Sequence, residues 1–431
     1  MKNFLQKMID EEIARDNIVG TSIMIAKNGK IIFESHSGLA DREAEKKVNA
    51  KTIFRFSSLT KPIVTAAALA LVEKGKLDLD LPITTWLPNF QPKLKSGVIA
   101  NITLRHLLNH TSGLTYGFLS EDNEPYHSAG VSDGLDEAVL SLEENLNRLA
   151  LVPLMFEPGT NWCYSVSTDV VGAILEKCCN MPLPEIIKRY VTEPLGMHDT
   201  VFYIQDSDRL AKAYADKGKK DEQTRLMQKK DKVLLPGCGF IHYAPGRITN
   251  PQAYPSGGGG MAGTSKDYLK FLEAIRQGGE QILSRASVAL MTQDCVENFD
   301  VPAAGPGYGF GMGFAVVRNS EEAGTPRQKG SFEWGGVYGC KMFVDPTADI
   351  SVVILTNTAL DGLLNFPVKI TQAIYDGLKL QDDFQYVRPQ SAEDSLISSI
   401  SHFTVKQEPP KVFFDVDAEE ISNNSDKPCL S

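Results

Sequence analysis

Several features are missing from this 431-residue sequence, and each absence excludes a class of protein. No apolar run reaches the ~18 residues of a membrane-spanning helix, so we expect no membrane span. Positive charge is not in excess, because 44 Lys and Arg stand against 54 Asp and Glu, for a net charge of −10. Proteins that bind the phosphate backbone are basic, so nucleic acid is not expected as a partner.

The sequence also lacks paired cysteines and a secretion signal. Its seven cysteines have no C-x-x-C spacing and are Cys163, Cys178, Cys179, Cys238, Cys295, Cys340 and Cys429. The opening MKNFLQKMIDEEIARDN has no apolar core of a signal peptide and indicates an amphipathic helix with one face formed by Phe4, Leu5, Met8, Ile9 and Ile13. We therefore expect reduced thiols and a cytoplasmic location, while export by a route without a signal peptide stays open.

The sequence contains only incomplete versions of the motifs that bind metals and cofactors. His106 and His110 have the spacing of a zinc pair, but HLLNH lacks the Glu of H-E-x-x-H and no third ligand is evident, so packing and capping are expected instead. Residues 258–263 match G-x-G-x-x-G without a preceding hydrophobic strand, which predicts a turn into a helix capped near Thr264. G-x-S-x-G is absent. We expect no metal and no cofactor.

Strand-like segments are present at both ends of the chain. Two β-type runs flank Asn28-Gly29, which predicts a hairpin. The runs FEWGG, CKMFVD and ISVVILTN come near the other end, before a helical stretch at 363–378. The sequence therefore predicts a mixed α/β fold, in which one antiparallel sheet is built from both chain ends, flanked by helices, and interrupted by a mostly helical insertion.

A serine and a lysine one helical turn apart form the first candidate for chemistry. Ser58 and Lys61 open an Ala- and Leu-rich helix, so their side chains can touch. Serine becomes a nucleophile when a base takes its proton, and a lysine serves as that base when burial lowers its pKa. A chain of this composition holds about two S-x-x-K matches by chance, so the motif needs support from its context.

That context resembles the serine β-lactamase and penicillin-binding-protein superfamily, above all its class C-type branch and the family VIII carboxylesterases. The resemblance covers roughly residues 1–380. It rests on SLTK at 58–61 and on segments in matching order: HTSGL at 110–114, FEPGTNWCYS at 156–165, EPLGM at 193–197, 257–268 and WGGVYG at 334–339.

The resemblance implies roles for individual residues. Ser58 matches the acylated nucleophile, Lys61 the lysine that activates it and Tyr164 the tyrosine that shuttles the proton. The backbone N–H groups of Ser58 and Val337 match the oxyanion hole. The substrate-binding strand carries Trp334, Gly335, Gly336 and Val337.

Two departures from class C lactamases bear on the substrate. Tyr164-Ser165-Val166 replaces Tyr-x-Asn, and Trp334-Gly335-Gly336 replaces Lys-Thr-Gly, so a polar amide and a cation are lost. A charged substrate group would be left unpaired there, which favours neutral esters over anionic β-lactams. Family VIII esterases share the W-G-G pattern.

We therefore expect a serine hydrolase, a carboxylesterase that cleaves short to medium acyl esters through acyl-Ser58. Three alternatives stay open. The first is a β-lactamase or D-amino-acid peptidase of the same superfamily, the second an acyltransferase, and the third a non-catalytic binding protein that keeps the fold. The expected partner is a small-molecule ester, and the sequence leaves the oligomeric state open.

The same reasoning divides the chain. Residues 1–380 form the β-lactamase-like catalytic domain, with a sheet part at about 1–80 and 280–380 and a helical part at about 81–279. Residues 382–431 hold ten Asp or Glu against four Lys or Arg. This composition predicts a flexible acidic tail, which could bind a protein partner.

Overall fold

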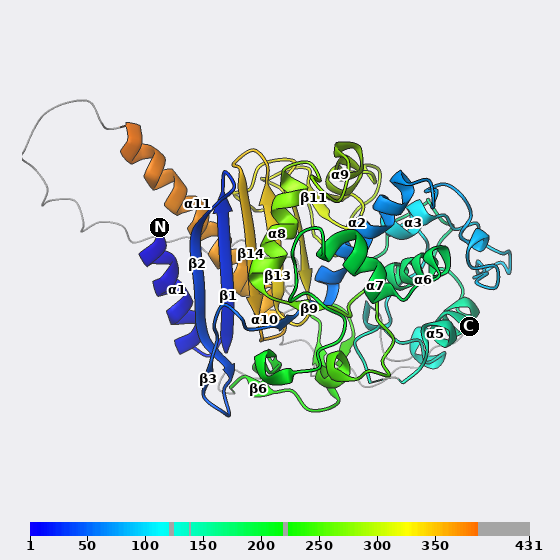
Figure 1. Cartoon of the computed structure of the whole chain (residues 1–431), viewed down its shortest axis with the longest axis horizontal. Coiled ribbons are helices and arrows are strands. Elements are labelled where there is room, and N and C mark those ends of the chain that lie inside the picture. Colours follow the sequence, from blue (N-terminus) through cyan, green and yellow to red (C-terminus); the bar gives the residue numbers. More distant parts are fainter. Residues whose placement is uncertain (120–124, 138, 219–222, 387–431) are drawn as a thin grey trace, which may run out of the picture.

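An antiparallel sheet of eight strands forms the centre of the computed structural model, which describes residues 1–119, 125–137, 139–218 and 223–386 (Figure 1). From residue 387 on, the predicted acidic tail lies outside the residues that the structure describes. In sheet order the strands are β10 (Tyr308–Phe310), β11 (Ala315–Val317), β12 (Phe332–Gly336), β13 (Cys340–Asp345), β14 (Ile350–Thr356), β1 (Gly20–Lys27), β2 (Lys30–Asp41) and β3 (Lys46–Lys47).

The two chain ends meet inside this sheet, as the sequence predicted. β1 lies between β2 and β14, and it pairs with β14 from Thr21 opposite Thr356 to Lys27 opposite Ile350. The predicted hairpin joins β1 to β2 at Asn28-Gly29, where both residues have positive φ (50° and 74°). Such a two-residue turn matches the twist of the strands it joins.

Side chains alternate between the two faces of the sheet, and each face has its own helices. Ile23 and Ile25 belong to the core beneath α1 (Lys2–Ala14) and α11 (Asn365–Tyr386), whereas Met24 belongs to the main core. The helix α8 (Ser265–Arg276) crosses the main-core face (Figure 1). Of the residues predicted on the apolar face of α1, Leu5 and Ile9 are fully buried, whereas Phe4 is 52% exposed.

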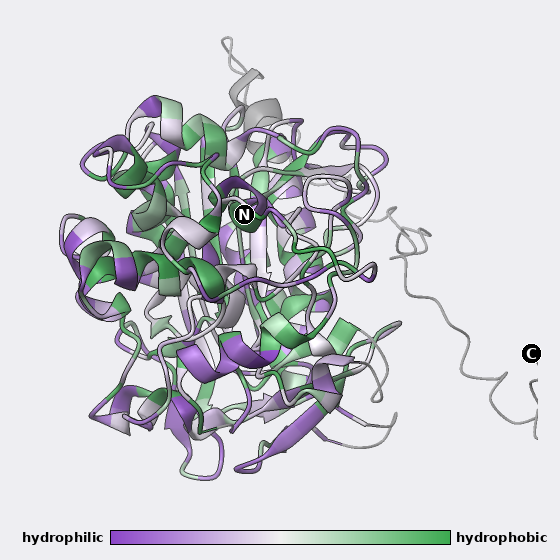
Figure 2. Cartoon of the chain, turned by 90° about the vertical axis from the view of Figure 1, so that its right-hand side faces the viewer, coloured by the Kyte–Doolittle hydropathy of each residue, from purple (hydrophilic) through white to green (hydrophobic). Residues whose placement is uncertain are grey.

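The remaining elements are mostly helices, and Figure 2 shows hydrophobic and hydrophilic residues along the helices of the molecule. These helices are α2 (Thr60–Glu73), α3 (Leu104–Leu108), α4 (Pro125–Ser128), α5 (Leu142–Leu151), α6 (Ser167–Cys179), α7 (Leu183–Ile187), α9 (Arg285–Thr292) and α10 (Leu360–Leu363). The short strand pairs are β4 (Phe54–Arg55) with β9 (Ala262–Gly263), β5 (Tyr214–Ala215) with β6 (Arg225–Leu226), and β7 (Asp231–Leu234) with β8 (Phe240–Tyr243).

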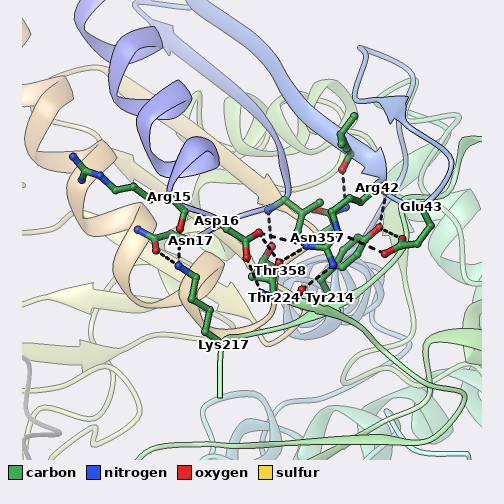
Figure 3. Close-up of polar contacts among 12 residues, drawn as sticks. Arg15, Asp16, Asn17, Arg42, Glu43, Tyr214, Lys217, Thr224, Asn357 and Thr358 are labelled. Carbon is green, nitrogen blue, oxygen red and sulfur yellow. Dashed lines mark hydrogen bonds and ion pairs between the residues drawn. The ribbon is translucent and has the colours of Figure 1, made fainter. Parts of the chain in front are cut away.

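A polar cluster ties the β5–β6 segment to both chain ends (Figure 3). The Asp16 carboxylate accepts from the backbone N–H and the hydroxyl of Thr224, at 2.7 and 2.8 Å. Arg42 donates to Thr224, and its guanidinium lies 5.0 Å from the centre of the Tyr214 ring. The Tyr214 hydroxyl donates to Glu43 at 2.6 Å. These paired groups hold the segment against the sheet, so we assign the cluster a structural role.

Two findings bear on the cellular setting. Six cysteines lie in the described part of the chain, and all six are free thiols. Within the same residues, no helix combines the length and the apolar character that crossing a membrane requires.

Candidate active site

The predicted nucleophile lies where a short 3-10 helix runs into a buried α-helix. Ser58 is the middle residue of η1 (Ser57–Leu59), which continues directly into α2. The residues of α2 are buried from Thr60 to Leu71, and the Lys61 side chain is 1% exposed. The three-residue spacing places the Lys61 Nζ 3.3 Å from the Ser58 Oγ.

The predicted tyrosine reaches the same serine from a distant part of the chain. Tyr164 lies just before α6, and its hydroxyl donates to the Ser58 Oγ at 2.6 Å. The structure thus brings together Ser58, Lys61 and Tyr164, and each is less than a tenth exposed. A hydroxyl flanked by an amine and a phenol can exchange protons with both.

Two further groups complete the surroundings of Lys61, and sequence reasoning missed them as ligands of the amine. The Lys61 Nζ donates to the Tyr116 Oη at 2.8 Å and to the Gly258 carbonyl at 2.8 Å. Tyr116 comes two residues after HTSGL, and that proximity was the available signal. A neutral amine has two N–H groups and one lone pair, so these two acceptors leave the lone pair for the Ser58 hydroxyl.

Burial controls the charge of this amine. It lowers the pKa of Lys61 to about 7, against the opposing effect of the Asp169 and Asp133 carboxylates. Asp133 is itself buried, which raises its pKa to about 7, while the Gly117 N–H donates to it at 3.1 Å. Lys61 is therefore partly neutral near pH 7, as a general base must be.

The phenol of Tyr164 has the opposite tendency. Burial raises its pKa above the ordinary value near 10, although the hydrogen bond with Ser58 opposes this rise. Tyr164 therefore stays protonated at neutral pH. It is suited to give a proton to a leaving group, and Lys61 to take one from Ser58.

Aromatic rings form one wall of the site around Tyr164. Trp334 packs edge-on against Tyr164 with ring centres 5.2 Å apart, and Phe310 packs against Trp334 at 5.2 Å. His110 contacts Tyr164 at 5.1 Å, and burial holds the pKa of His110 well below its usual value. This wall is aromatic, and His110 packs within it while its Nδ1 is hydrogen-bonded to the Ser165 hydroxyl at 3.0 Å.

The predicted oxyanion strand lies directly against η1. A Cβ on Gly336 would overlap the carbonyl oxygen of Phe56, so only glycine lets β12 approach η1 this closely. A Cβ on Gly335 would instead meet the end of the Leu363 side chain. Val337 follows β12, and its carbonyl accepts from the Tyr243 hydroxyl at 2.9 Å.

The glycine run at 258–263 forms another wall of the site. Gly258 accepts from Lys61, and a Cβ there would be 2.9 Å from the Tyr116 Oη. Thr264 caps α8 through its side chain, which accepts from the Asp267 N–H. The predicted turn and cap are therefore present.

Comparison with known proteins agrees with this geometry. Residues 5–364 match the family model described as Beta-lactamase. The chain is 41% identical over 374 residues to Esterase EstB from Burkholderia gladioli, which covers 86% of this chain and 94% of that protein.

Two other relatives extend the comparison. The structure of EstCE1, described as a hydrolase with promiscuous acyltransferase activity, is 42% identical with a TM-score of 0.83, covering 86% of this chain and 98% of that one. Monacolin J acid methylbutanoyltransferase from Aspergillus terreus is 26% identical over 326 residues, which are 69% of this chain and 74% of that protein. The chain therefore belongs to the beta-lactamase family.

Proposed function

We propose that this protein is a carboxylesterase that works through an acyl-Ser58 intermediate. The observation that carries the proposal is the contact of one serine hydroxyl with a buried amine and a phenol, at 3.3 and 2.6 Å. The low pKa of the amine supports its role as a base. The 41% identity to a protein named an esterase supports the reaction class.

The proposed reaction has two halves. The Ser58 Oγ attacks the ester carbonyl carbon while the Lys61 amine takes its proton, and the Ser58 and Val337 N–H groups hold the oxyanion. Tyr164 then gives its proton to the departing alcohol oxygen and regains one from Lys61. Water attacks the acyl group in the same manner, which releases the acid and restores the Ser58 hydroxyl.

The walls of the site favour a neutral alcohol part. Tyr164, which protonates the leaving group, packs against the ring of Trp334, and Trp334 in turn packs against Phe310. No described cation replaces the lysine of the Lys-Thr-Gly motif on this wall, so the carboxylate of a β-lactam would lack a partner. Esters are therefore preferred over β-lactams and over D-amino-acid peptides.

Turnover of p-nitrophenyl butyrate tests the proposal. We expect hydrolysis by the wild type, a fall of at least about a thousandfold for Ser58→Ala, and no change for the exposed Ser207→Ala. Nitrocefin should be cleaved far more slowly than the ester. Retained activity in Ser58→Ala, or a preference for nitrocefin, would reject the proposal.

Acyl transfer is a second candidate, since one acyl-enzyme can react with water or with an alcohol. The name given to EstCE1 and the 26% identity to a methylbutanoyltransferase favour it. Added short alcohols should then raise the rate of p-nitrophenol release and yield the new ester. If added alcohol changes neither the rate of p-nitrophenol release nor the product, hydrolysis is the only reaction and acyl transfer is rejected.

We also propose that the protein is located in the cytoplasm. We further propose that residues 382–431 bind a protein partner. The free thiols of the described cysteines support a reducing compartment. The acidic composition of 382–431 supports the second point. Fractionation of cells that express the full chain tests the first, and crosslinking with and without 387–431 tests the second.

A further inference from the structure

The indole of Trp334 brings a hydrogen-bond donor into the aromatic wall of the site. Its Nε1 is buried and makes no hydrogen bond within the part of the chain that the structure describes, and the residue is only 6% exposed. A buried indole N–H usually has a partner, because an unpaired donor has lost its water and gained nothing in return. A group that becomes an acceptor during the reaction would supply the missing partner.

The strand β12 holds this indole against the catalytic phenol. Trp334 and Phe332 are two residues apart on the strand, and both belong to the main core. The Trp334 ring stands edge-on to the Tyr164 ring, with the ring centres 5.2 Å apart and the ring planes at 64°. The Tyr164 oxygen lies 2.6 Å from the Ser58 Oγ, so the indole is separated from the nucleophile by one side chain.

The phenol responds to this neighbour. Burial is the largest influence on the pKa of Tyr164 and raises it, whereas Ser58 and then Trp334 lower it, and Tyr116 does so to a smaller extent. A lower pKa means that the neighbour favours the deprotonated phenol. The Nε1–H is the hydrogen-bond donor of a tryptophan side chain, so it is the group that can favour an oxygen anion.

The proposed reaction creates such an anion on Tyr164. In the free protein the Tyr164 oxygen uses its own hydrogen on Ser58, and the Lys61 amine donates to Tyr116 and to the Gly258 carbonyl. When Tyr164 gives its proton to the departing alcohol, a negative oxygen forms in a buried site. Until Lys61 returns a proton, the unpaired indole N–H can stabilise that charge with a charge-assisted hydrogen bond.

We propose that the Trp334 Nε1–H donates a hydrogen bond to the Tyr164 oxygen as this oxygen becomes negative, which makes Trp334 a catalytic residue of the reaction. This inference rests on the proposed esterase function and adds a residue to its machinery. In the step concerned, the O–H bond of Tyr164 breaks and an O–H bond to the alcohol oxygen forms. The bond from the acyl carbon to that oxygen breaks with its electron pair on the oxygen, and the indole keeps its proton.

Two esters with the same acyl group test the inference through their leaving groups. p-Nitrophenolate can leave p-nitrophenyl butyrate without a proton near neutral pH, whereas the alcohol of ethyl butyrate needs one. The variant Trp334→benzothienylalanine keeps the two fused rings and replaces the N–H with sulfur. It should lower kcat/KM for ethyl butyrate about tenfold or more, and that for p-nitrophenyl butyrate by less than about threefold.

Trp162 offers a matched control. Its Nε1 is also buried and unpaired among the described residues, but its ring contacts His110 and Phe310. Trp162→benzothienylalanine should therefore leave the ratio of the two kcat/KM values as in the wild type. Losses in Trp334→benzothienylalanine that are equal for both esters, or absent from both, overturn the role of the Trp334 N–H. Circular dichroism of each variant shows that it is folded.

A titration without turnover separates the two proposals. Fluorine lowers the pKa of a phenol, so difluorotyrosine at position 164 brings its ionisation into a range that fluorine NMR can follow. The pKa of this residue should rise in Trp334→benzothienylalanine and stay the same in Trp162→benzothienylalanine. A wild type that cleaves neither ester refutes the esterase proposal, while the titration still tests the hydrogen bond. A pKa that does not rise in the Trp334 variant overturns the inference even if the esterase proposal holds.

Discussion

At the scale of single residues, the charge of Lys61 decides when the site can react. Several groups face the Lys61 amine. Tyr116 does so through its hydroxyl and Tyr164 through its ring. His110 and the carboxyls of Asp133 and Asp169 act on it electrostatically. Burial lowers the pKa of the amine to about 7, and the two carboxylates act in the opposite direction. The base is therefore active only above that pH.

The pH dependence of kcat/KM for p-nitrophenyl butyrate follows from this value. Activity should rise as the pH passes upward through about 7, because Lys61 must lose a proton to accept one from Ser58. Asp169→Asn removes a carboxylate that holds the proton on Lys61, so the rise should move to lower pH. The exposed Asp206→Asn is the matched control. A rise that moves upward, or does not move, in Asp169→Asn would contradict this assignment.

Tyr116 should matter nearly as much as the predicted residues. Tyr116→Phe removes the oxygen that accepts from Lys61 at 2.8 Å, so the amine loses its orientation toward Ser58. We expect kcat to fall about tenfold to a hundredfold with little change in KM. The exposed Tyr203→Phe should behave as wild type. A wild-type kcat in Tyr116→Phe would show that the Gly258 carbonyl alone orients the amine.

The sequence predicted Ser58, Lys61 and Tyr164 because each belongs to a short motif with recognisable neighbours. Asp169 and Asp133 belong to no such motif. Their influence on Lys61 arises from burial and from distances between segments far apart in the chain, which local spacing does not encode. The functional roles of the three motif residues, and of Val337 and Trp334, remain predictions.

At the scale of elements, the closeness of β12 and η1 depends on one glycine. Gly336→Ala places a Cβ against the backbone of Phe56, so the strand or the nucleophile must shift. A shift of about 1 Å can cost a hundredfold in rate, and we expect kcat/KM to fall by about that factor. In Gly335→Ala the severe overlap is with the flexible end of Leu363, while the Cys340 carbonyl oxygen is 3.3 Å away, so the loss should be smaller. Equal losses in both variants would refute this account.

The two helices on the outer face of the sheet are joined by an ion pair. Lys369 on α11 donates to both oxygens of Glu12 on α1, at 2.8 Å each. Burial alone would raise the pKa of Glu12, but hydrogen bonds from Lys369 and Asn17 lower it overall from 4.5. A carboxyl with a lowered pKa stabilises the fold above its unfolded pKa, and this stabilisation is lost as the pH falls through the folded pKa.

Glu12→Gln should therefore unfold more easily at pH 7, by about 1–2 kcal/mol, a modest figure because Lys369 is 43% exposed. The difference from wild type should shrink below pH 4.5, as thermal unfolding at several pH values can measure. The more exposed Glu11→Gln serves for comparison. A difference that persists unchanged in acid would argue against the ion pair as its source.

Elements with strong local signals were predictable, and short ones were not. Asn28-Gly29 specified a hairpin through its turn conformation, and short apolar runs bounded by turn residues specified β12, β13 and β14. The two-residue strands β4 and β9 have no local signature, since only their pairing with each other, Phe54 with Gly263 and Arg55 with Ala262, defines them. The helix pattern of α1 also did not distinguish Phe4, which is 52% exposed, from the fully buried Leu5 and Ile9, because exposure depends on the elements packed against the helix.

At the scale of the whole molecule, the predicted catalytic residues all lie between Ser58 and Val337. A chain that ends at Tyr386 keeps every described strand and helix. We expect such a truncated protein to hydrolyse p-nitrophenyl butyrate within about twofold of the full chain. A much larger loss would place part of the function in residues 387–431.

The arrangement of the sheet was predictable from where its strands lie in the sequence, because strands at both ends with helices between them have few compact solutions. The order of the strands and the position of β1 between β2 and β14 were not, since pairing partners so far apart leave no trace in local patterns.

The position of β1 between β2 and β14 determines when the sheet can be completed during translation. Gly20–Lys27 leaves the ribosome early, yet its neighbour Ile350–Thr356 follows only after residues 28–349 have been translated. At ~5–20 residues per second this delay is roughly a quarter of a minute to a minute. Throughout that interval one edge of the hairpin is without its permanent partner, and the strand that adjoins Ser58 is made only near the end of it. Ser58 therefore waits for Phe332–Gly336 to be translated before the arrangement described above can form around it.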